Sequence, residues 1–98
     1  MITEIITAIT TRKRVAITYM KQRVKKVYKK LEIYCYGINE SNGKQYIRIY
    51  DVTDKKWKLF LLENIIDISL IENDNIRVLN SDYNHYSDAV ITKIIAKI

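Results

Sequence analysis

Two groups of residues in this 98-residue sequence have side chains that could bind a polyanion. The first is the run from Arg12 to Lys30, which holds nine basic residues and no acidic one. The rest of the chain holds 8 basic and 11 acidic residues, so the net charge of +6 is concentrated in one segment. Such a segment attracts phosphate-bearing partners and speeds their capture. We assign electrostatic capture to five of its members: Arg23, Lys25, Lys26, Lys29 and Lys30. The alternative is a solvated, charge-rich hairpin that only keeps the protein in solution.

The second group is the alternating sequence around Arg48. In an extended strand, Ile47 and Ile49 point to one face, while Tyr46, Arg48 and Tyr50 point to the other. Tyrosine rings and a guanidinium plane can stack on nucleobases, and the guanidinium can also pair with phosphate. The alternative is an aromatic ladder that stabilises the sheet itself.

Signals for enzymatic chemistry are weak. His85 is the only histidine and Cys35 the only cysteine, so one chain cannot form a His/Cys metal cluster. Cys35 alternates with Leu31 and Ile33 on an expected core face, which disfavours a Cys–His nucleophile pair. The acidic residues have no spacing typical of a metal or acid/base site, and no glycine-rich phosphate loop is present. The sequence predicts no enzyme, no cofactor and no metal.

The elements that position these residues follow from apolar spacing. Ile2, Ile5, Ile6 and Ile9 form one stripe of a helix over residues 2–12. Alternating residues then predict strands, with residues 23–30 either extended or a short helix and the extended form favoured. Asn42-Gly43 predicts a turn. The expected strands cover residues 15–19, 31–36, 46–52, 57–62 and 65–71.

The end of the chain has helical spacing again. Residues 73–87 are a polar connection, after which Ser87 or Asp88 can cap a helix. That helix would carry an apolar face made of Val90, Ile91, Ile94, Ile95 and Ile98. Short strands without intervening helices predict a small curled sheet or barrel. We therefore expect a mainly β, α+β fold in a single domain, residues 1–98, with an N-terminal helix and a C-terminal helical segment.

The composition and the N-terminal sequence indicate the cellular compartment of the protein. A lone cysteine favours reducing surroundings, and the N-terminus lacks the pattern of a signal peptide. No run approaches the roughly 18 apolar residues of a membrane helix. We expect a cytoplasmic protein, in a bacterial cell or a phage-infected cell, that does not contact a membrane.

The order of these elements resembles a known family. The sequence has RKRVAITY at residues 12–19, YCYG at 34–37, YIRIYDV at 46–52 and WKLF at 57–60. With the tail at residues 82–98, this order resembles the small stand-alone branch of the WYL-domain family. The resemblance implies a five-stranded, Sm-like open β-barrel with attached helices. It also implies a role in sensing nucleic acid or nucleotide-like ligands, often in transcription control or phage defence, and a tendency to form homo-oligomers.

The sequence departs from the family pattern at its ligand-binding positions. Only Tyr46 of the name-giving Trp-Tyr-Leu is kept, because Gln45 and Ile47 flank it. Leu61 and Asn64 stand where the family usually has basic residues central to ligand binding. The binding surface has either moved to the basic hairpin or been lost.

Two functions follow from these observations. The first is a non-enzymatic WYL-like module that binds single-stranded nucleic acid or a nucleotide-type ligand and acts in regulation. The alternative is a small phage or mobile-element structural protein that uses the barrel and the C-terminal isoleucines for protein–protein assembly.

Overall fold

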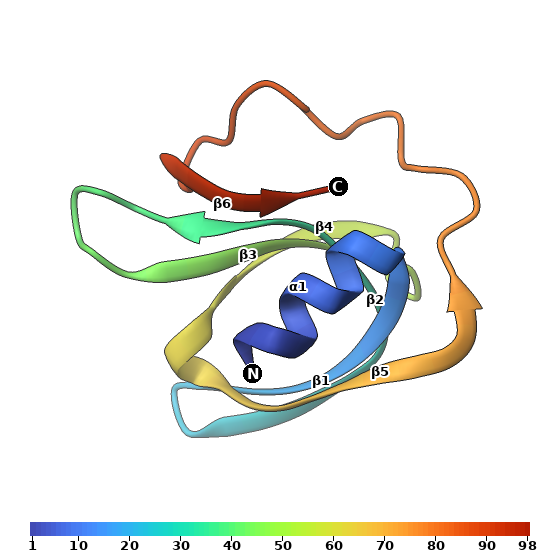
Figure 1. The fold of residues 1–98 in the computed structure, drawn as a ribbon. Helices are drawn as coiled ribbons and strands as arrows, with labels where there is room; N and C mark the ends of the chain where they lie inside the picture. The colour runs from blue at the N-terminus through green and yellow to red at the C-terminus, as the bar shows by residue number, and fades with distance from the viewer.

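The computed structural model describes all 98 residues, and most of them form a curved antiparallel sheet around one helix (Figure 1). The chain begins with a helix and then forms successive strands, of which β4 and β5 are joined by one turn of 3₁₀ helix, η1. The elements are α1 (Ile2–Thr11), β1 (Lys13–Lys21), β2 (Val24–Ile38), β3 (Gln45–Asp51), β4 (Lys56–Leu61), η1 (Leu62–Asn64), β5 (Ile65–Asn75) and β6 (Lys93–Lys97).

The strands are ordered β4-β3-β2-β1-β5, and β6 pairs with β2 away from this path. Every pairing is antiparallel. No hydrogen-bonded ladder joins β4 to β5, so the sheet curls around α1 without closing (Figure 1). The prediction of a mainly β fold with an N-terminal helix is confirmed, and residues 24–30, favoured as extended, do lie in a strand.

The longest hairpin joins β1 to β2 and carries most of the basic run. Lys21 pairs with Val24, which leaves only Gln22 and Arg23 as the turn. Both have positive φ, 52° and 65°, which is the geometry of a type I′ turn. That turn matches the twist of the two strands but normally recruits Asn and Gly, because other side chains are strained there.

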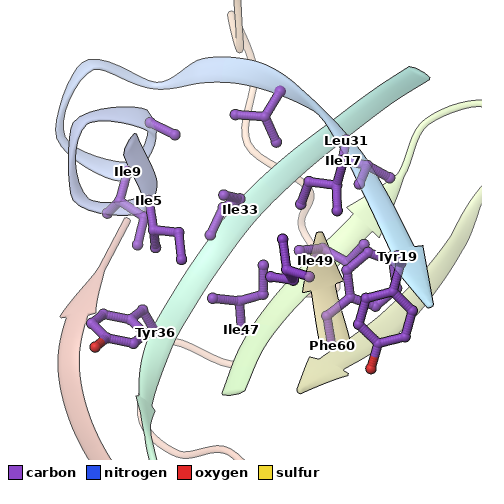
Figure 2. Packing of buried hydrophobic residues seen from close by; sticks show 13 residues of the cluster. Ile5, Ile9, Ile17, Tyr19, Leu31, Ile33, Tyr36, Ile47, Ile49 and Phe60 are labelled. Atoms are coloured by element: carbon purple, nitrogen blue, oxygen red, sulfur yellow. The ribbon is translucent and has the colours of Figure 1, made fainter. Parts of the chain in front are cut away.

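The main core lies on the inner face of the curl. Ile5 and Ile9 of α1 pack over Ile33 and Ile47 of the sheet, as Figure 2 shows. At the other end of this cluster Tyr19 and Phe60 stack with ring centroids 4.2 Å apart. The apolar stripe predicted on α1 is therefore the face that binds the sheet, although Ile2 at its start stays exposed.

A second, smaller cluster lies on the outer face and holds the tail of the chain. Tyr34 and Cys35 of β2 pack there with Tyr83 and Ile91, which lie after β5. The chain leaves β5, loops away and returns as β6 beside β2 (Figure 1). Gly37 permits this approach, because a Cβ at that position would lie 2.6 Å from Ile91 Cγ2 and would collide with the carbonyl oxygen of Lys93.

The prediction of a C-terminal helix is wrong, and with it the count of five strands. Lys93–Lys97 forms the sixth strand, β6. β1 pairs with β2 only as far as Leu31, so the edge of β2 is free of β1 at residues 35–38, where β6 binds. Isoleucine side chains suit a strand, and pairing with this open edge outweighs a helical spacing that has little else to stabilise it.

No helix is both long enough and apolar enough to span a bilayer.

Candidate functional site

The β1–β2 hairpin carries a cluster of cations that form no ion pair within the protein. Five basic side chains near its turn have no carboxylate oxygen within 4.0 Å of their nitrogen atoms. The molecule forms nine ion pairs, and none of them includes these five side chains. We call these five the hairpin cations: Lys21, Arg23, Lys25, Lys26 and Lys29. A positive cluster left unpaired in a protein that pairs most of its acidic groups is free to attract an external anion.

The hairpin cations overlap with the predicted capture residues but are not identical to them. Arg23, Lys25, Lys26 and Lys29 belong to both sets. Lys30 lies 3.7 Å from Asp74 and is partly neutralised. Lys21 was not singled out from the sequence; its place at the end of β1, directly before the turn, could have identified it.

The part of the basic run that lies next to α1 stabilises the fold through Arg14. Arg14 donates from Nε to Glu32 and from Nη1 to Asp74, at 2.9 and 2.8 Å. Glu32 is buried and also accepts a hydrogen bond from the Tyr34 hydroxyl at 2.8 Å. Burial raises the pKa of Tyr34 to about 12, so this hydroxyl remains a donor. The positive run thus contains three residues paired with carboxylates, Lys13, Arg14 and Lys30, besides the hairpin cations near the turn.

A cavity of about 450 Å³ opens between the hairpin and β4. Tyr19, Tyr28 and Phe60 supply its aromatic lining. Lys21 and Lys26 are among the other residues that line it. We call this cavity the hairpin basin. It contains three aromatic rings beside two of the hairpin cations, and no acidic residue lines it. Sequence reasoning did not find it, because its residues are scattered over three strands.

Lys58 forms the wall of the basin on β4 and is already paired. Its ammonium group donates to Asp51 at 2.8 Å and to Asp54 at 2.9 Å. Burial opposes its charge, but these two hydrogen bonds prevail and raise the pKa of Lys58. The same group lies 4.6 Å from the centroid of the Tyr28 ring, and Lys26 lies 4.8 Å from it. Tyr28 is thereby in contact with one paired cation, Lys58, and one cation without an ion pair, Lys26.

The predicted stripe of Tyr46, Arg48 and Tyr50 does lie opposite the core isoleucines. Ile47 and Ile49 are fully buried in the main core, whereas Tyr46 and Tyr50 pack against the outer cluster. The tail covers that face, so the stripe is half-buried by the chain itself. Tyr46 accepts a hydrogen bond from Asn42, and Tyr50 lies edge-on to Trp57 at 5.2 Å.

Arg48 is engaged by a carboxylate from the tail. Its Nε and Nη2 donate to the two oxygens of Asp88 at 2.9 and 3.0 Å. The side chains of Arg48 and Asp88 are 22% and 7% exposed. The stripe ends at Tyr50, which pairs with the buried Glu32, and the hairpin cations lie further along the sheet toward the turn.

Cys35, the nucleophile considered from the sequence, is poorly placed. Cys35 is fully buried, and burial raises the pKa of its thiol, the opposite of what a nucleophile requires. His85 stacks edge-on against Tyr83 at 4.7 Å. No cluster of three or more His, Cys, Asp or Glu side chains could hold a metal ion.

Comparison with known proteins gave one finding. A family model described as the WYL domain matches residues 1–70 of the 98. No curated protein and no solved structure matches the chain. The matched part includes the hairpin, the basin and the stripe, whereas the tail that covers the stripe lies outside it.

Proposed function

This chain belongs to the WYL-domain family, and from that premise we propose that it is a regulatory module, without enzymatic activity, that binds single-stranded nucleic acid or a nucleotide-type ligand. WYL domains are regulatory modules that bind ligands or nucleic acids. The observation that carries the proposal for this chain is the set of five unpaired hairpin cations, which gives one end of the molecule a strong positive field.

The density of these cations suits a phosphate backbone better than a single carboxylate. Lys25, Lys26 and Lys29 lie within the first six residues of β2, and Lys21 is the last residue of β1, paired with Val24. Alternation along a strand sends neighbouring side chains to opposite faces, so the hairpin is positive on both sides. A flexible single strand can follow such a surface, and the release of its counterions drives binding.

The strained backbone of the turn supports the interpretation that the hairpin has a function in binding. Arg23 has φ of 65°, where glycine would be less strained. A side chain kept in an unfavourable backbone region is a reason to look for a function at that position. In the proposal, Arg23 is the outermost phosphate contact.

The stripe has a smaller part in the proposal. Asp88 already holds the two groups of Arg48 that a phosphate would use, so a ligand reaches Arg48 only by displacing Asp88. Tyr46 and Tyr50 could then stack on bases exposed along the same face. The hairpin can act without this step.

The proposal also covers the type of barrel and the number of domains. We infer an Sm-like open barrel, formed by the five-strand path and α1, with residues 1–98 as one domain. Support comes from the strong curl of the sheet and from the packing of residues beyond 70 against β2 in the outer cluster (Figure 1).

Binding of a fluorescein-labelled oligothymidylate to the full chain, followed by anisotropy, tests the proposed function. Affinity should fall steeply between about 50 and 200 mM salt, since each neutralised phosphate on a single strand contributes roughly 0.7 to the slope of log K against log salt. Five cations therefore allow a slope of up to about −3.5. Absence of binding at the lowest salt, together with stable self-association, would favour the assembly protein instead.

A further inference from the structure

We propose that the hairpin basin is a binding site for one phosphate-bearing nucleotide, whose base lies against Tyr28 and whose phosphate binds Lys21 and Lys26. The inference rests on the proposed function and adds a location, a stoichiometry and a chemical class to it. The ligand is either a free nucleoside monophosphate or the phosphorylated end of a strand, which present the same group.

The size and lining of the basin suit a small planar ligand. Its volume of about 450 Å³ falls within the range of small-molecule sites, which are concave, mostly apolar and supplied with a few polar groups. Tyr19 and Phe60 are stacked, and Tyr28 lies 5.1 Å from Phe60 at a tilt of 58°. The Tyr19 hydroxyl accepts a hydrogen bond from the backbone N–H of Leu61 at 3.0 Å, which fixes this ring in place. The aromatic wall is therefore formed before a ligand arrives.

Tyr28 is the ring best placed to meet a base. Tyr19 and Phe60 are buried in the main core, whereas Tyr28 is only half-buried. Its hydroxyl makes no hydrogen bond within the protein, in contrast to the hydroxyls of Tyr19, Tyr34, Tyr36 and Tyr46. Stacking on an aromatic side chain is tolerant of base identity, so this contact sets the ligand class and not the base.

The charges around the basin direct the phosphate to one side. Lys58 is bonded to two carboxylates, so its surroundings repel a phosphate. Lys21 and Lys26 form no ion pair within 4.0 Å and line the hairpin side of the basin. The hydrogen bond from Lys58 lowers the pKa of Asp54, and Lys26 lies near enough to that carboxyl to lower it further. The ammonium group of Lys26 lies over the Tyr28 ring, 4.8 Å from its centroid, so a base that stacks there displaces this group from the ring and leaves it beside the phosphate. Two free ammonium groups match the two charges of a monophosphate.

The test uses the full chain, labelled with ¹⁵N and titrated with AMP. Amide shifts are expected at Tyr19, Lys26, Tyr28 and Phe60, and none at Tyr46 and Tyr50 on the outer face. Adenosine and inorganic phosphate should each bind more weakly than AMP, because each lacks one half of the ligand. Shifts confined to the outer face, or equal binding of adenosine and AMP, would overturn the inference.

Variants assign the two halves of the ligand. Lys26→Gln should weaken AMP binding about tenfold, the value of one charge-assisted hydrogen bond, and should not weaken adenosine binding. Tyr28→Leu should weaken both. Lys93→Gln removes an exposed lysine from β6, at the far end of β2, and should change neither. Equal affinities for AMP in Lys26→Gln and in Lys93→Gln would overturn the assignment.

Oligonucleotides with different 5′ ends distinguish the two possible sources of the phosphate, a free nucleotide and the end of a nucleic-acid strand. An oligothymidylate with a 5′-phosphate that competes with AMP and binds more tightly than the 5′-hydroxyl form would identify a strand end as a ligand. Tight AMP binding without this difference identifies the free nucleotide. If oligothymidylate binds but neither Lys26→Gln nor Tyr28→Leu alters AMP binding, the basin inference fails and the proposed function stands. Absence of any nucleotide or strand binding at low salt defeats both.

Discussion

Arg48 on β3 and Asp88 in the tail form a two-point ion pair across forty residues of sequence, with N–O distances of 2.9 and 3.0 Å. Asp88 is nearly buried and also accepts the backbone N–H groups of Val90 and Ile91 through Oδ1. One carboxylate thus holds the start of the final segment to the sheet. The guanidinium that the sequence suggested as a ligand contact fastens the tail in this structure.

Replacing Asp88 should therefore loosen the tail. Asp88→Ala leaves the half-buried Arg48 without its partner and removes the acceptor of two backbone N–H groups, so we expect a loss of about 3 kcal/mol in the free energy of unfolding. Urea unfolding followed by Trp57 fluorescence measures this loss. Asp67→Ala, which removes an exposed carboxylate without an ion pair, is the control and should stay within about 0.5 kcal/mol of the parent.

The same carboxylate makes stability fall in acid. Burial acts to raise the pKa of Asp88, but the hydrogen bonds from Arg48, Ile91 and Val90 prevail and lower it to about 2. The unfolded chain takes up this proton near pH 4 and the folded chain only near pH 2. The stabilisation is thus complete above pH 4 and is lost as the pH falls to 2. We expect the parent to lose about 1–2 kcal/mol more over this window than Asp88→Asn does. Parallel pH profiles for the two proteins would contradict this assignment.

The two glycines should respond differently to alanine. Gly37→Ala places a methyl group against Ile91 and the Lys93 carbonyl, where backbone must move, so we expect β6 to detach and residues 91–97 to lose protection from hydrogen exchange. Gly43→Ala meets no atom within 4 Å but has φ of 73°, so it should cost about 1 kcal/mol without exposing β6. Equal exchange in β6 of the two variants would contradict the role given to Gly37.

Two neighbouring cations should differ in their importance for stability. Arg14→Ala leaves the buried Glu32 without a cation, and we expect a loss of about 3 kcal/mol in the free energy of unfolding. Lys13 pairs with Glu72, whose side chain is 76% exposed, so Lys13→Ala should cost no more than about 0.5 kcal/mol. Chemical denaturation of both variants measures the difference, and similar losses would show that the pairing with Glu32 is not what matters.

A substitution at Arg23 in the turn should change stability and oligothymidylate binding in opposite directions. Arg23→Gly relieves the positive φ and should raise the free energy of unfolding by about 0.5 kcal/mol, because relief of strain exceeds the entropy that glycine adds to the unfolded chain. It also removes one phosphate contact and should weaken oligothymidylate binding. Arg23→Lys keeps both charge and strain and should resemble the parent. Denaturation and anisotropy on the same samples measure both effects, and a stabilised variant with unchanged affinity would exclude Arg23 from the interface.

Local patterns in the sequence were sufficient for most of the sheet. Alternation placed Ile47 and Ile49 inside and Tyr46 and Arg48 outside, and the structure agrees. Cys35 is an instructive exception, because it was expected beside Ile33 on the core face. An irregularity in register between Ile33 and Cys35 transfers it to the outer cluster. Such a bulge is set by tertiary packing and leaves no pattern in the sequence.

Long-range pairing explains what the sequence could not reveal. The isoleucines of the tail fit a helical period, and only the open edge of β2 selects a strand for residues 93–97. Likewise, nothing near Arg48 in sequence indicates Asp88, and nothing near Tyr28 indicates Lys58. The free or paired state of each cation depends on contacts of this kind, which is why the basic run could be found but not divided into its structural and exposed parts.

The salt dependence of oligothymidylate binding in two charge-matched variants tests the central claim most directly. Lys25→Gln/Lys29→Gln removes two hairpin cations, and Arg77→Gln/Lys93→Gln removes two unpaired cations outside the hairpin. The hairpin variant should lower the slope of log K against log salt by about 1.4, and the control should leave it unchanged, although both have the same net charge. Equal slopes in the two variants would contradict the claim that the hairpin is where the protein binds a polyanion.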